Sequence, residues 1–382
     1  MRVMISCGEP SGDMYAAELA RRIRAHDPSA VITGFGGERL REAGAQLTGD
    51  YRGLSVTGLL EVVRLLPRTY RMFRRLVAAA RAHPPDVFVA VDFPDFNFRL
   101  AAAIRRLGVP IVYYISPQLW AWRSGRMKTM RALADRVLVI FPFEQAIYEQ
   151  AGVPVEWVGH PLLDVMPASL PKELLAAELG LSPSSPVVAL LPGSRRNEVT
   201  AILPNLVEAG RVIRARLPDV QFVVPRAPHI APELLAPLDA LQPRTVVLEG
   251  RADDVLQVAD VALVASGTVT VQAALHACPM VVVYRLSPLT YRLGRRFVRV
   301  DTFAMANLVA GKRVVPELIQ DDFTPQRVAA EAIDILTNPE RASRMKEDLR
   351  AVRAKLGSPG ASDRAAVAVL EAARRSPAKS LR

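Results

Sequence analysis

Cysteine is scarce in this chain, which has two, Cys7 and Cys278, among 382 residues. Both lie in or beside apolar segments, so we expect reduced thiols in the core, and their number excludes a disulfide framework. No apolar run approaches the roughly 18 residues of a membrane-spanning helix. The short apolar start, residues 1–7, also lacks the length of a secretory signal. We therefore expect a cytoplasmic protein that contacts a membrane only from the side.

Motifs for metals, dinucleotides and nucleic acids are missing too. The histidines show no metal-ligand spacing, and we predict no structural metal; His160 alone is kept as a cleft candidate. Residues 34–37 follow a strand-like run but lack the glycine spacing of a dinucleotide fingerprint. There is no zinc-finger spacing, RNA-recognition motif or Lys-rich tail, which argues against a nucleic-acid partner.

What the chain does have is apolar content and positive charge. Hydrophobic residues make up 50% of the sequence, which excludes wholesale disorder, and the length suits two domains. The formal net charge is +11. Such a balance favours an anionic partner, either a membrane surface or a phosphorylated substrate.

Apolar runs typical of buried strands alternate with helical patterns along the whole chain. They occupy residues 3–7, 31–35, 87–91, 111–115, 137–140, 156–158, 187–191, 220–224, 245–248, 261–264 and 280–284. This alternation predicts an α/β protein with parallel sheets covered on both faces. We expect two Rossmann-like doubly wound domains, residues 1–165 and 166–382, that face a central cleft; the chain should end in helices. Ligands bind such folds at the carboxyl ends of the strands.

Two strand ends in the second half predict anion binding. The run 187–191 leads into Gly193, Ser194 and Arg195, with a helix expected to begin near Asn197. Glycine allows the tight turn, and the helix N–H groups, the dipole and the guanidinium suit a phosphate. The alternative is an ordinary turn with a surface arginine. A second turn, Ser266-Gly267-Thr268, follows residues 261–265, so we predict a nucleotide diphosphate held from two sides.

Two strand ends in the first half carry further candidates. After the first strand, Glu9, Ser11 and Asp13 can hydrogen-bond ligand hydroxyls, and Gly12 permits close approach; a plain helix cap is an equal alternative. Asp92 follows the run 87–91. A carboxylate there can accept a proton from a substrate hydroxyl, whereas the alternative is a turn or cap role.

Residues 58–75 combine apolar clusters with arginines. This pattern suits a helix lying on a membrane surface, although a core helix with a solvated arginine face fits the pattern alone better. The overall positive charge supports the membrane interpretation. The predicted lipid contacts are Leu59, Leu60, Val63, Leu65 and Leu66.

Taken together, these motifs resemble the lipid-A-disaccharide synthase family of inverting GT-B glycosyltransferases. The matching stretches occur in family order from residue 3 to about 370; they are residues 8–13, 91–97, 114–123, 141–144, 158–161, 190–195, 266–268 and 307–311. Leu-Pro-Gly-Ser-Arg at 191–195 is shared among several sugar transferases. The run Ser116-Pro-Gln-Leu-Trp-Ala-Trp122 is far more particular to this family.

The resemblance implies a metal-independent, cofactor-free transfer of 2,3-diacylglucosamine. The donor would be UDP-2,3-diacylglucosamine, and the acceptor the 6-hydroxyl of 2,3-diacylglucosamine 1-phosphate; the products would be lipid A disaccharide 1-phosphate and UDP. By this likeness Asp92 is the general base and Arg195 steadies the leaving diphosphate. The remaining implied contacts are Gly193, Ser194, Ser266, Gly267, Thr268, Gln272 and Asn307 for UDP, and Glu9, Ser11, Gly12 and Asp13 for the acceptor.

One position departs from the family pattern. Members usually carry Glu a few residues after the Ser-Gly-Thr turn, where related transferases bind the ribose hydroxyls, but this chain has Gln272. Glutamine lacks the charge-assisted strength of a carboxylate, so UDP would be held more weakly or differently. Two other functions therefore stay open: a UDP-sugar epimerase or a transferase with another acceptor, and a non-catalytic protein that binds anionic lipid. We expect the protein on the inner face of the cytoplasmic membrane; a homodimer is left open.

Overall fold

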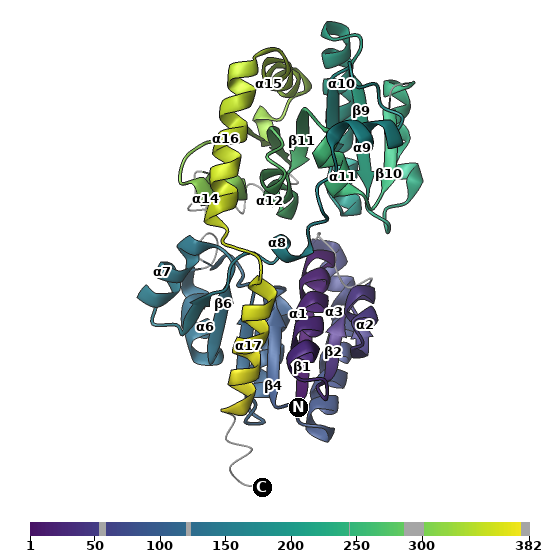
Figure 1. Ribbon diagram of the computed structural model, residues 1–382. Helices are drawn as coiled ribbons and strands as arrows, with labels where there is room; N and C mark the ends of the chain where they lie inside the picture. The colour runs from purple at the N-terminus through teal and green to yellow at the C-terminus, as the bar shows by residue number, and fades with distance from the viewer. Residues whose placement is uncertain (53–58, 120–123, 244, 286–301, 376–382) are drawn as a thin grey trace. The chain divides into compact units, whose positions relative to one another are not determined.

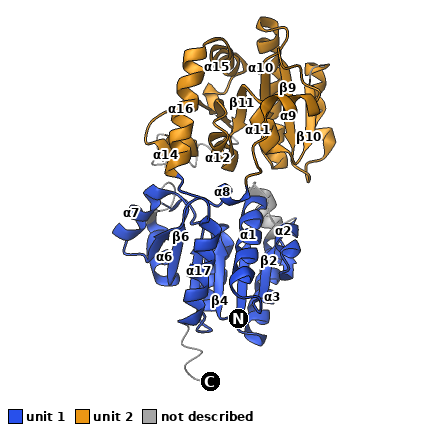
Figure 2. Ribbon diagram, in the orientation of Figure 1, with its two compact units in different colours: residues 1–165, 356–382 blue, residues 166–355 orange. Residues whose placement is uncertain are grey.

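A computed structural model describes residues 1–52, 59–119, 124–243, 245–285 and 302–375; for residues 59–65 and 124 it describes the backbone alone. The chain forms two compact units (Figure 2). Unit 1 comprises residues 1–165 and 356–382, and unit 2 comprises residues 166–355.

Unit 1 is built on a seven-stranded parallel sheet in the order β3-β2-β1-β4-β5-β6-β7. Its strands are β1 (Arg2–Cys7), β2 (Val31–Gly36), β3 (Gln46–Asp50), β4 (Val87–Val91), β5 (Ile111–Tyr114), β6 (Arg136–Val139) and β7 (Val155–Trp157). Every residue of β4 is buried, as expected for an apolar central strand with helices on both faces. The chain starts at β1, proceeds outward to β3, and then crosses back to β4, so the strand order reverses between β1 and β4.

Helices cover both faces of this sheet. They are α1 (Pro10–His26), α2 (Glu38–Glu42), α3 (Leu59–Ala82), α4 (Pro94–Arg105), η1 (Ser124–Arg126), α6 (Met127–Leu133), α7 (Pro142–Gln150), α8 (Leu162–Val165) and α17 (Ala361–Arg374). Pro10, Pro94 and Pro142 each open a helix, where the missing N–H is not needed.

Unit 2 contains a six-stranded parallel sheet in the order β10-β9-β8-β11-β12-β13. Its strands are β8 (Val187–Leu191), β9 (Gln221–Arg226), β10 (Thr245–Glu249), β11 (Val261–Ala265), β12 (Met280–Tyr284) and β13 (Glu317–Ile319). The helical segments are α9 (Lys172–Glu178), α10 (Arg196–Arg216), η2 (Pro232–Leu241), α11 (Ala252–Val258), α12 (Thr268–Leu275), α14 (Met305–Ala310), η3 (Gln320–Asp322), α15 (Pro325–Thr337) and α16 (Pro339–Lys355). Here the order reverses between β8 and β11.

The end of the chain returns to unit 1, where α17 lies beside α1 although the two are at opposite ends of the sequence (Figure 1). The carboxylate of Asp164 accepts hydrogen bonds from the N–H groups of Gly360 at 2.5 Å and Ser362 at 2.7 Å, which fixes the start of α17. The predicted second domain, residues 166–382, includes this segment, whereas residues 356–382 complete the first unit. Helical periodicity predicts the helix but not the sheet that it covers.

The two parallel sheets confirm the predicted α/β class. The central cleft stays a prediction. Within the described residues, no helix combines the length and the apolar character that a membrane crossing requires.

Candidate active site

The predicted catalytic carboxylate lies at the point where the sheet of unit 1 reverses its strand order. β1 and β4 are paired neighbours, with Cys7 opposite Val91. The loop that begins with Gly8 and Glu9 follows β1, and Asp92 follows β4. Ligands of doubly wound sheets bind at this reversal, so the sequence-predicted acceptor loop and base share one edge.

Asp92 has an unusual backbone. Its φ is 44°, and that of the next residue, Phe93, is 50°. Two consecutive non-glycine residues in the left-handed region cost roughly 1–2 kcal/mol each. Such a conformation persists only when its surroundings hold it.

The groups that hold this turn are buried. The Asn97 amide donates to the Asp92 carbonyl at 2.8 Å and to the Ser6 carbonyl at 3.1 Å, and it accepts from Ser6 Oγ at 2.7 Å. The Tyr113 hydroxyl donates to the same Asp92 carbonyl at 2.9 Å. Asn97 is fully buried and therefore ties the ends of β1 and β4 together. This role of Asn97 could not be predicted from the sequence, in which Asn97 is the last residue of the motif 91–97 and has no assigned function.

The Asp92 side chain is half-buried, and its charge acts on the buried hydroxyls of Tyr113 and Tyr15. Burial, with the nearby Asp92 carboxylate as the next cause, raises the pKa of Tyr113 well above its usual value. Burial also raises the pKa of Tyr15, to which the charges of Tyr114 and Asp92 contribute. Both hydroxyls therefore stay protonated around this carboxylate.

Asp13, predicted to bind the acceptor, has a different role. It is 2% exposed, and its carboxylate accepts from the backbone N–H groups of Gly37 at 2.7 Å, Arg39 at 3.0 Å and Leu40 at 3.3 Å. It thus caps α2, and burial raises its pKa. Asp13 therefore has a structural role, and its direct contact with the acceptor stays a prediction.

The other residues of the acceptor loop are placed differently. Glu9 and Ser11 are half-buried at the start of α1. Gly12 is buried, and a Cβ added there would lie 3.4 Å from the Cβ of Cys7. Of the acceptor loop, Glu9 and Ser11 thus have side chains that are partly exposed to solvent, and the acceptor contacts of the loop stay a prediction.

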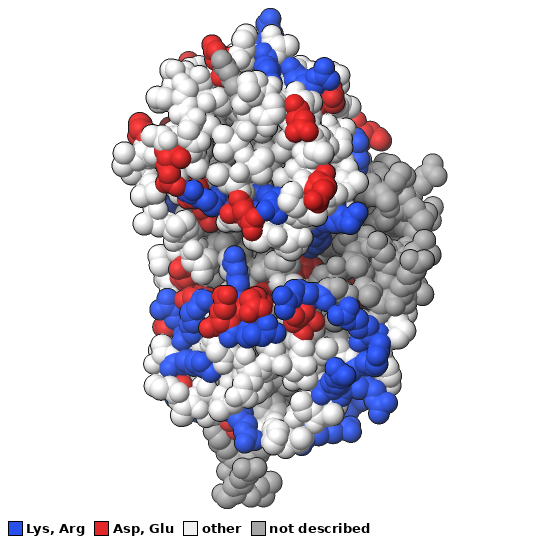
Figure 3. Space-filling model, turned by 90° about the vertical axis from the view of Figure 1, so that its right-hand side faces the viewer, with Lys and Arg blue, Asp and Glu red and all other residues white. Residues whose placement is uncertain are grey.

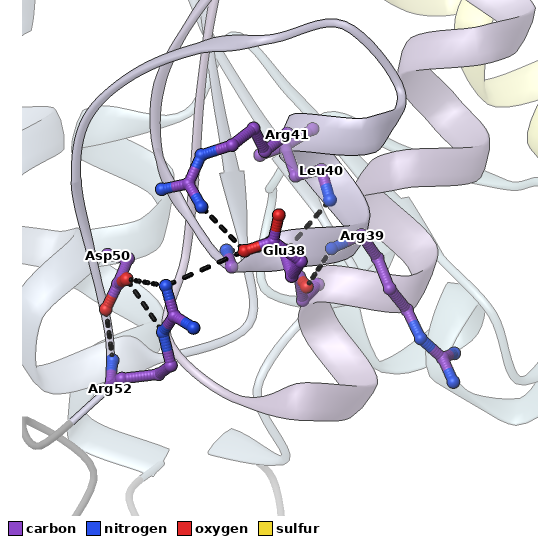
Figure 4. Close-up of polar contacts among 8 residues, drawn as sticks. Glu38, Arg39, Leu40, Arg41, Asp50 and Arg52 are labelled. Carbon is purple, nitrogen blue, oxygen red and sulfur yellow. Dashed lines mark hydrogen bonds and ion pairs between the residues drawn. The ribbon is translucent and has the colours of Figure 1, made fainter. Parts of the chain in front are cut away.

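Charged side chains cluster where Asp13 caps α2 (Figure 4). Arg41 pairs with Glu38 at 2.6 Å; Arg52 pairs with Asp50 at 2.6 Å and lies 3.6 Å from Glu38. The guanidinium of Arg39 points away from these pairs. In this cluster the charges of Arg41 and Arg52 are paired with Glu38 and Asp50, whereas the Arg39 guanidinium lies apart from these ion pairs.

In unit 2, the two predicted diphosphate turns follow β8 and β11, the neighbouring strands between which the order reverses. Gly193 has a φ of 115°, and a Cβ there would lie 2.5 Å from the Glu198 carboxylate. Gly267 has a φ of 156°. Both turns therefore need glycine, and both lie where a doubly wound sheet binds its ligand.

The first turn already holds an anion of the protein itself. Glu198 accepts from the backbone N–H groups of Ser194 at 3.1 Å and Arg195 at 3.2 Å, and from Arg195 Nη1 at 2.8 Å. These N–H groups thus have an acceptor in Glu198, and their binding to a phosphate stays a prediction. The sequence contained the signal for this contact, because Glu198 is three residues after Arg195, the N-cap of α10, as in a capping box.

The same turn is contacted by His229, a histidine that was not among the candidates from the sequence. His229, in the loop after β9, lies with Nε2 2.7 Å from the Ser194 carbonyl oxygen. Because a carbonyl can only accept, Nε2 carries the hydrogen. His229 thus adds a polar ring beside Arg195, whereas His160, the predicted cleft histidine, is 1% exposed and packs against Tyr15 and Phe141.

The second turn differs from the first in its charges. α12 has no acidic side chain in its first turn, so no carboxylate of its own offsets the positive end of the helix dipole. Ser266 Oγ donates to the Phe303 carbonyl at 3.3 Å, which ties the turn to the segment before α14. Of the two turns, the start of α12 is the one better prepared for an external anion.

Asn307, predicted to bind UDP, is buried beneath this region. Its Oδ1 accepts from the N–H groups of Val314 at 2.7 Å and Val315 at 3.0 Å, while Nδ2 donates to Glu317 at 2.6 Å. The amide is 1% exposed and bonded to the protein on both ends. Asn307 therefore has a structural role, and its contact with the nucleotide stays a prediction.

Comparison with known proteins identifies the chain. Residues 3–372 match the family model described as lipid-A-disaccharide synthetase. The chain belongs to this family. It is 45% identical over 371 residues to the lipid-A-disaccharide synthase of Geobacter sulfurreducens and 43% identical over 371 residues to that of Myxococcus xanthus, covering 97% of both chains in each case.

Solved structures with more distant sequences share the fold of this lipid-A-disaccharide synthetase family member. A UDP-GlcNAc 2-epimerase from Neisseria meningitidis, bound to UDP-GlcNAc, gives a TM-score of 0.69 at 14% identity, covering 97% of this chain and 100% of the other. The glycotransferase of kitacinnamycin gives 0.64 at 19% identity, covering 97% and 98%. At these identities the likeness shows the fold alone, which is of the predicted GT-B type.

The predicted membrane segment of this family member forms α3. The side chains of Leu59, Leu60, Val63 and Leu65 lie outside the described residues, as do Trp120 and Trp122. Leu66 is 50% exposed, and its contact with lipid stays a prediction.

Proposed function

We propose that this member of the family transfers 2,3-diacylglucosamine from UDP-2,3-diacylglucosamine to the 6-hydroxyl of 2,3-diacylglucosamine 1-phosphate. The products are the β-1,6-linked disaccharide 1-phosphate and UDP. The observation that carries the proposal is the constrained turn at Asp92. A carboxylate held in the left-handed region at the reversal of a doubly wound sheet is placed for contact with a ligand.

In the proposed reaction, Asp92 is the general base. It accepts the proton of the acceptor 6-hydroxyl while that oxygen attacks C1 of the donor sugar. The bond between C1 and the diphosphate oxygen breaks, and the electron pair leaves with UDP. Attack from the side opposite the leaving group inverts the configuration at C1.

Unit 2 contributes the groups for the leaving diphosphate. We assign these to the start of α12, with Gly267 and Thr268, and to the turn Gly193–Arg195. The dipole and the guanidinium stabilise charge that grows on the diphosphate as the bond breaks. Gln272 is assigned to the nucleotide, and Glu9 and Ser11 to the acceptor. This chemistry draws on the protein's own cationic and N–H groups.

The proposal places the protein on the inner face of the cytoplasmic membrane, docked through α3 on anionic lipid. On this helix Tyr70 is 61% exposed and Leu66 is 50% exposed, and Arg71 and Arg74 are exposed beside them. Figure 3 shows Lys and Arg side chains gathered on this side of unit 1. An apolar stripe with flanking arginines suits an anionic headgroup surface. A homodimer stays a prediction.

The test is direct turnover. The full chain is incubated with UDP-diacylglucosamine and the diacylated monosaccharide phosphate, and the products are separated by thin-layer chromatography and weighed by mass spectrometry. Asp92→Asn keeps the left-handed backbone, which Asn also tolerates, so kcat should fall by about 10²–10⁴-fold while UDP still binds. Turnover of UDP-GlcNAc without lipid, or an Asp92→Asn enzyme of normal kcat, would contradict the proposal.

A further inference from the structure

One carboxylate of unit 2 contacts two side chains of the helix that bears Gln272. Asp253 lies in the first turn of α11, and its Oδ1 is 3.4 Å from Gln272 Nε2 and 2.9 Å from His276 Nε2. Gln272 lies on α12 and His276 is the residue at its C-terminal cap, four positions further on, so the two side chains lie on the same side of the helix. The His276 side chain is 4% exposed and that of Asp253 is 26% exposed, so the cluster is largely withdrawn from water.

The chemistry of this contact fixes the orientation of Gln272. An ionised carboxylate can only accept hydrogen bonds, so the amide must turn its nitrogen toward Asp253. The amide oxygen of Gln272 is then directed away from Asp253, and an amide oxygen can accept hydrogen bonds. An amide oxygen, like a carboxylate oxygen, can accept a hydrogen bond from a hydroxyl group.

The neighbouring carboxylate is engaged differently. Asp254 accepts from Arg251 Nε at 2.5 Å, and Arg251 also pairs with Glu178 at 2.7 Å. Asp254 is therefore part of an ion-pair group on α11 and α9, while the contacts of Asp253 lie on α12. The two adjacent aspartates form a matched pair in which one contacts Gln272 and the other does not.

We infer that Asp253 is a positioning residue of the nucleotide site, which orients Gln272 so that its Oε1 accepts a ribose hydroxyl of UDP. The inference rests on the proposed function, in which unit 2 binds UDP with Gln272. Asp253 thereby lets an amide act where the family usually carries a carboxylate. His276 supports the arrangement by holding the same carboxylate oxygen.

The experiment compares two nucleotides by isothermal titration of the full chain. UDP has both ribose hydroxyls, and 2′,3′-dideoxy-UDP has neither. Gln272→Ala should weaken UDP binding by about 2- to 10-fold, the effect of one hydrogen bond, and leave the dideoxy nucleotide unchanged. Asp253→Ala should do the same, and the double variant should lose no more than either single one, because the two residues act as a unit.

Further variants separate positioning from a merely structural role. Asp254→Ala is the control and should keep the wild-type ratio of the two affinities. Asp253→Asn, which preserves the side-chain shape, should shift this ratio in the same direction as Asp253→Ala. Combining Asp253→Asn with Gln272→Glu returns the carboxylate to position 272 and should restore the preference for UDP.

Each outcome bears on a different claim. If wild type binds neither nucleotide, the proposed function of unit 2 is wrong. If Gln272→Ala loses the preference for UDP but Asp253→Ala and Asp253→Asn keep it, the inference about Asp253 is overturned while the site stands. If the Asp253 variants lose affinity for both nucleotides equally, the inference about Asp253 is also overturned, because a residue with only a structural role would have that effect.

Discussion

The buried amide of Asn97 donates a 2.8 Å hydrogen bond to the main-chain carbonyl of Asp92, the residue proposed as the general base. The same amide bonds to Ser6 on the neighbouring strand. A side chain without access to solvent therefore fixes the backbone from which the carboxylate projects. The geometry of the base depends on a residue that cannot itself contact the substrate.

Replacing Asn97 by Ala should harm both stability and turnover. The variant removes the Asn97 partner of the buried Ser6 hydroxyl, and an unsatisfied buried group costs about 1–3 kcal/mol. It also removes one of the two hydrogen bonds to the Asp92 carbonyl and leaves the one from Tyr113. Urea denaturation should show the loss, and kcat should fall while the Kd for UDP is unchanged, because UDP is assigned to unit 2. Asn205→Ala, which removes one 3.1 Å bond to Phe323 in unit 2, is the control and should leave kcat unaffected. A normal kcat in the Asn97 variant would show that the turn at Asp92 keeps its conformation without Asn97.

Replacing Glu198 by Gln should strengthen UDP binding. Glu198 accepts from the turn assigned to the diphosphate, and its charge opposes a second anion there. Removal of one negative charge within a few ångströms should lower the Kd for UDP by about three- to tenfold and steepen its dependence on salt. Glu208→Gln, on the same helix beside Arg211, is the matched control. Weaker UDP binding in the Glu198 variant would instead make this carboxylate a support for Arg195.

The sequence was sufficient to predict the fold class, the turns at which the candidate residues lie and every strand of the two sheets except the edge strands β3 and β13. Apolar runs bounded by Gly and Pro signal buried strands locally, and the residues that follow them must lie at one edge of a parallel sheet. Asp92 and the Gly193 and Gly267 turns were therefore found.

The direction of each polar side chain could not be predicted in this way. Asp13 and Asn307 turn inward because distant backbone N–H groups, at Gly37 and Val314, need acceptors. Those partners are 24 and 7 residues away in sequence and are brought close only by packing. The position of α17 could not be predicted either, because its sequence pattern predicts a helix but does not indicate which of the two sheets that helix covers.

Stability should fall in mild acid because of His160. Burial lowers the pKa of His160 to about 3, far below the usual value of about 6.5 for the unfolded chain. Between these two values the unfolded state binds a proton that the folded state does not, so unfolding becomes easier as the pH falls. The expected contribution is about 1.4 kcal/mol per pH unit below pH 6.5.

Urea denaturation at pH 7, 6 and 5 measures this contribution. His160 Nδ1 accepts from the Leu162 N–H at 3.2 Å, and Asn can supply an oxygen in its place. His160→Asn should therefore flatten the pH dependence. The exposed His83, replaced in the same way, should leave it unchanged. Parallel curves for wild type and His160→Asn would assign the acid sensitivity to other groups.

Binding to lipid vesicles should depend on the exposed face of α3. Arg71 and Arg74 are exposed beside Leu66 and Tyr70, and each arginine near an anionic surface contributes about 1 kcal/mol. The full chain should cosediment with phosphatidylglycerol vesicles more than with phosphatidylcholine vesicles. Arg71→Glu with Arg74→Glu should reduce this binding by about tenfold or more.

Two further variants distinguish a membrane-docking face from general attraction between charges. Arg344 is exposed on α16 of unit 2, and Arg344→Glu changes the net charge by the same amount as either α3 reversal. It should leave vesicle binding nearly unchanged because it is not on α3. Leu66→Ser alters no charge and should still weaken binding, since it removes apolar surface that enters the headgroup region. If all three arginine reversals acted equally and Leu66→Ser had no effect, the attraction would be that of a basic protein to any anionic surface, and α3 would have no specific part in it.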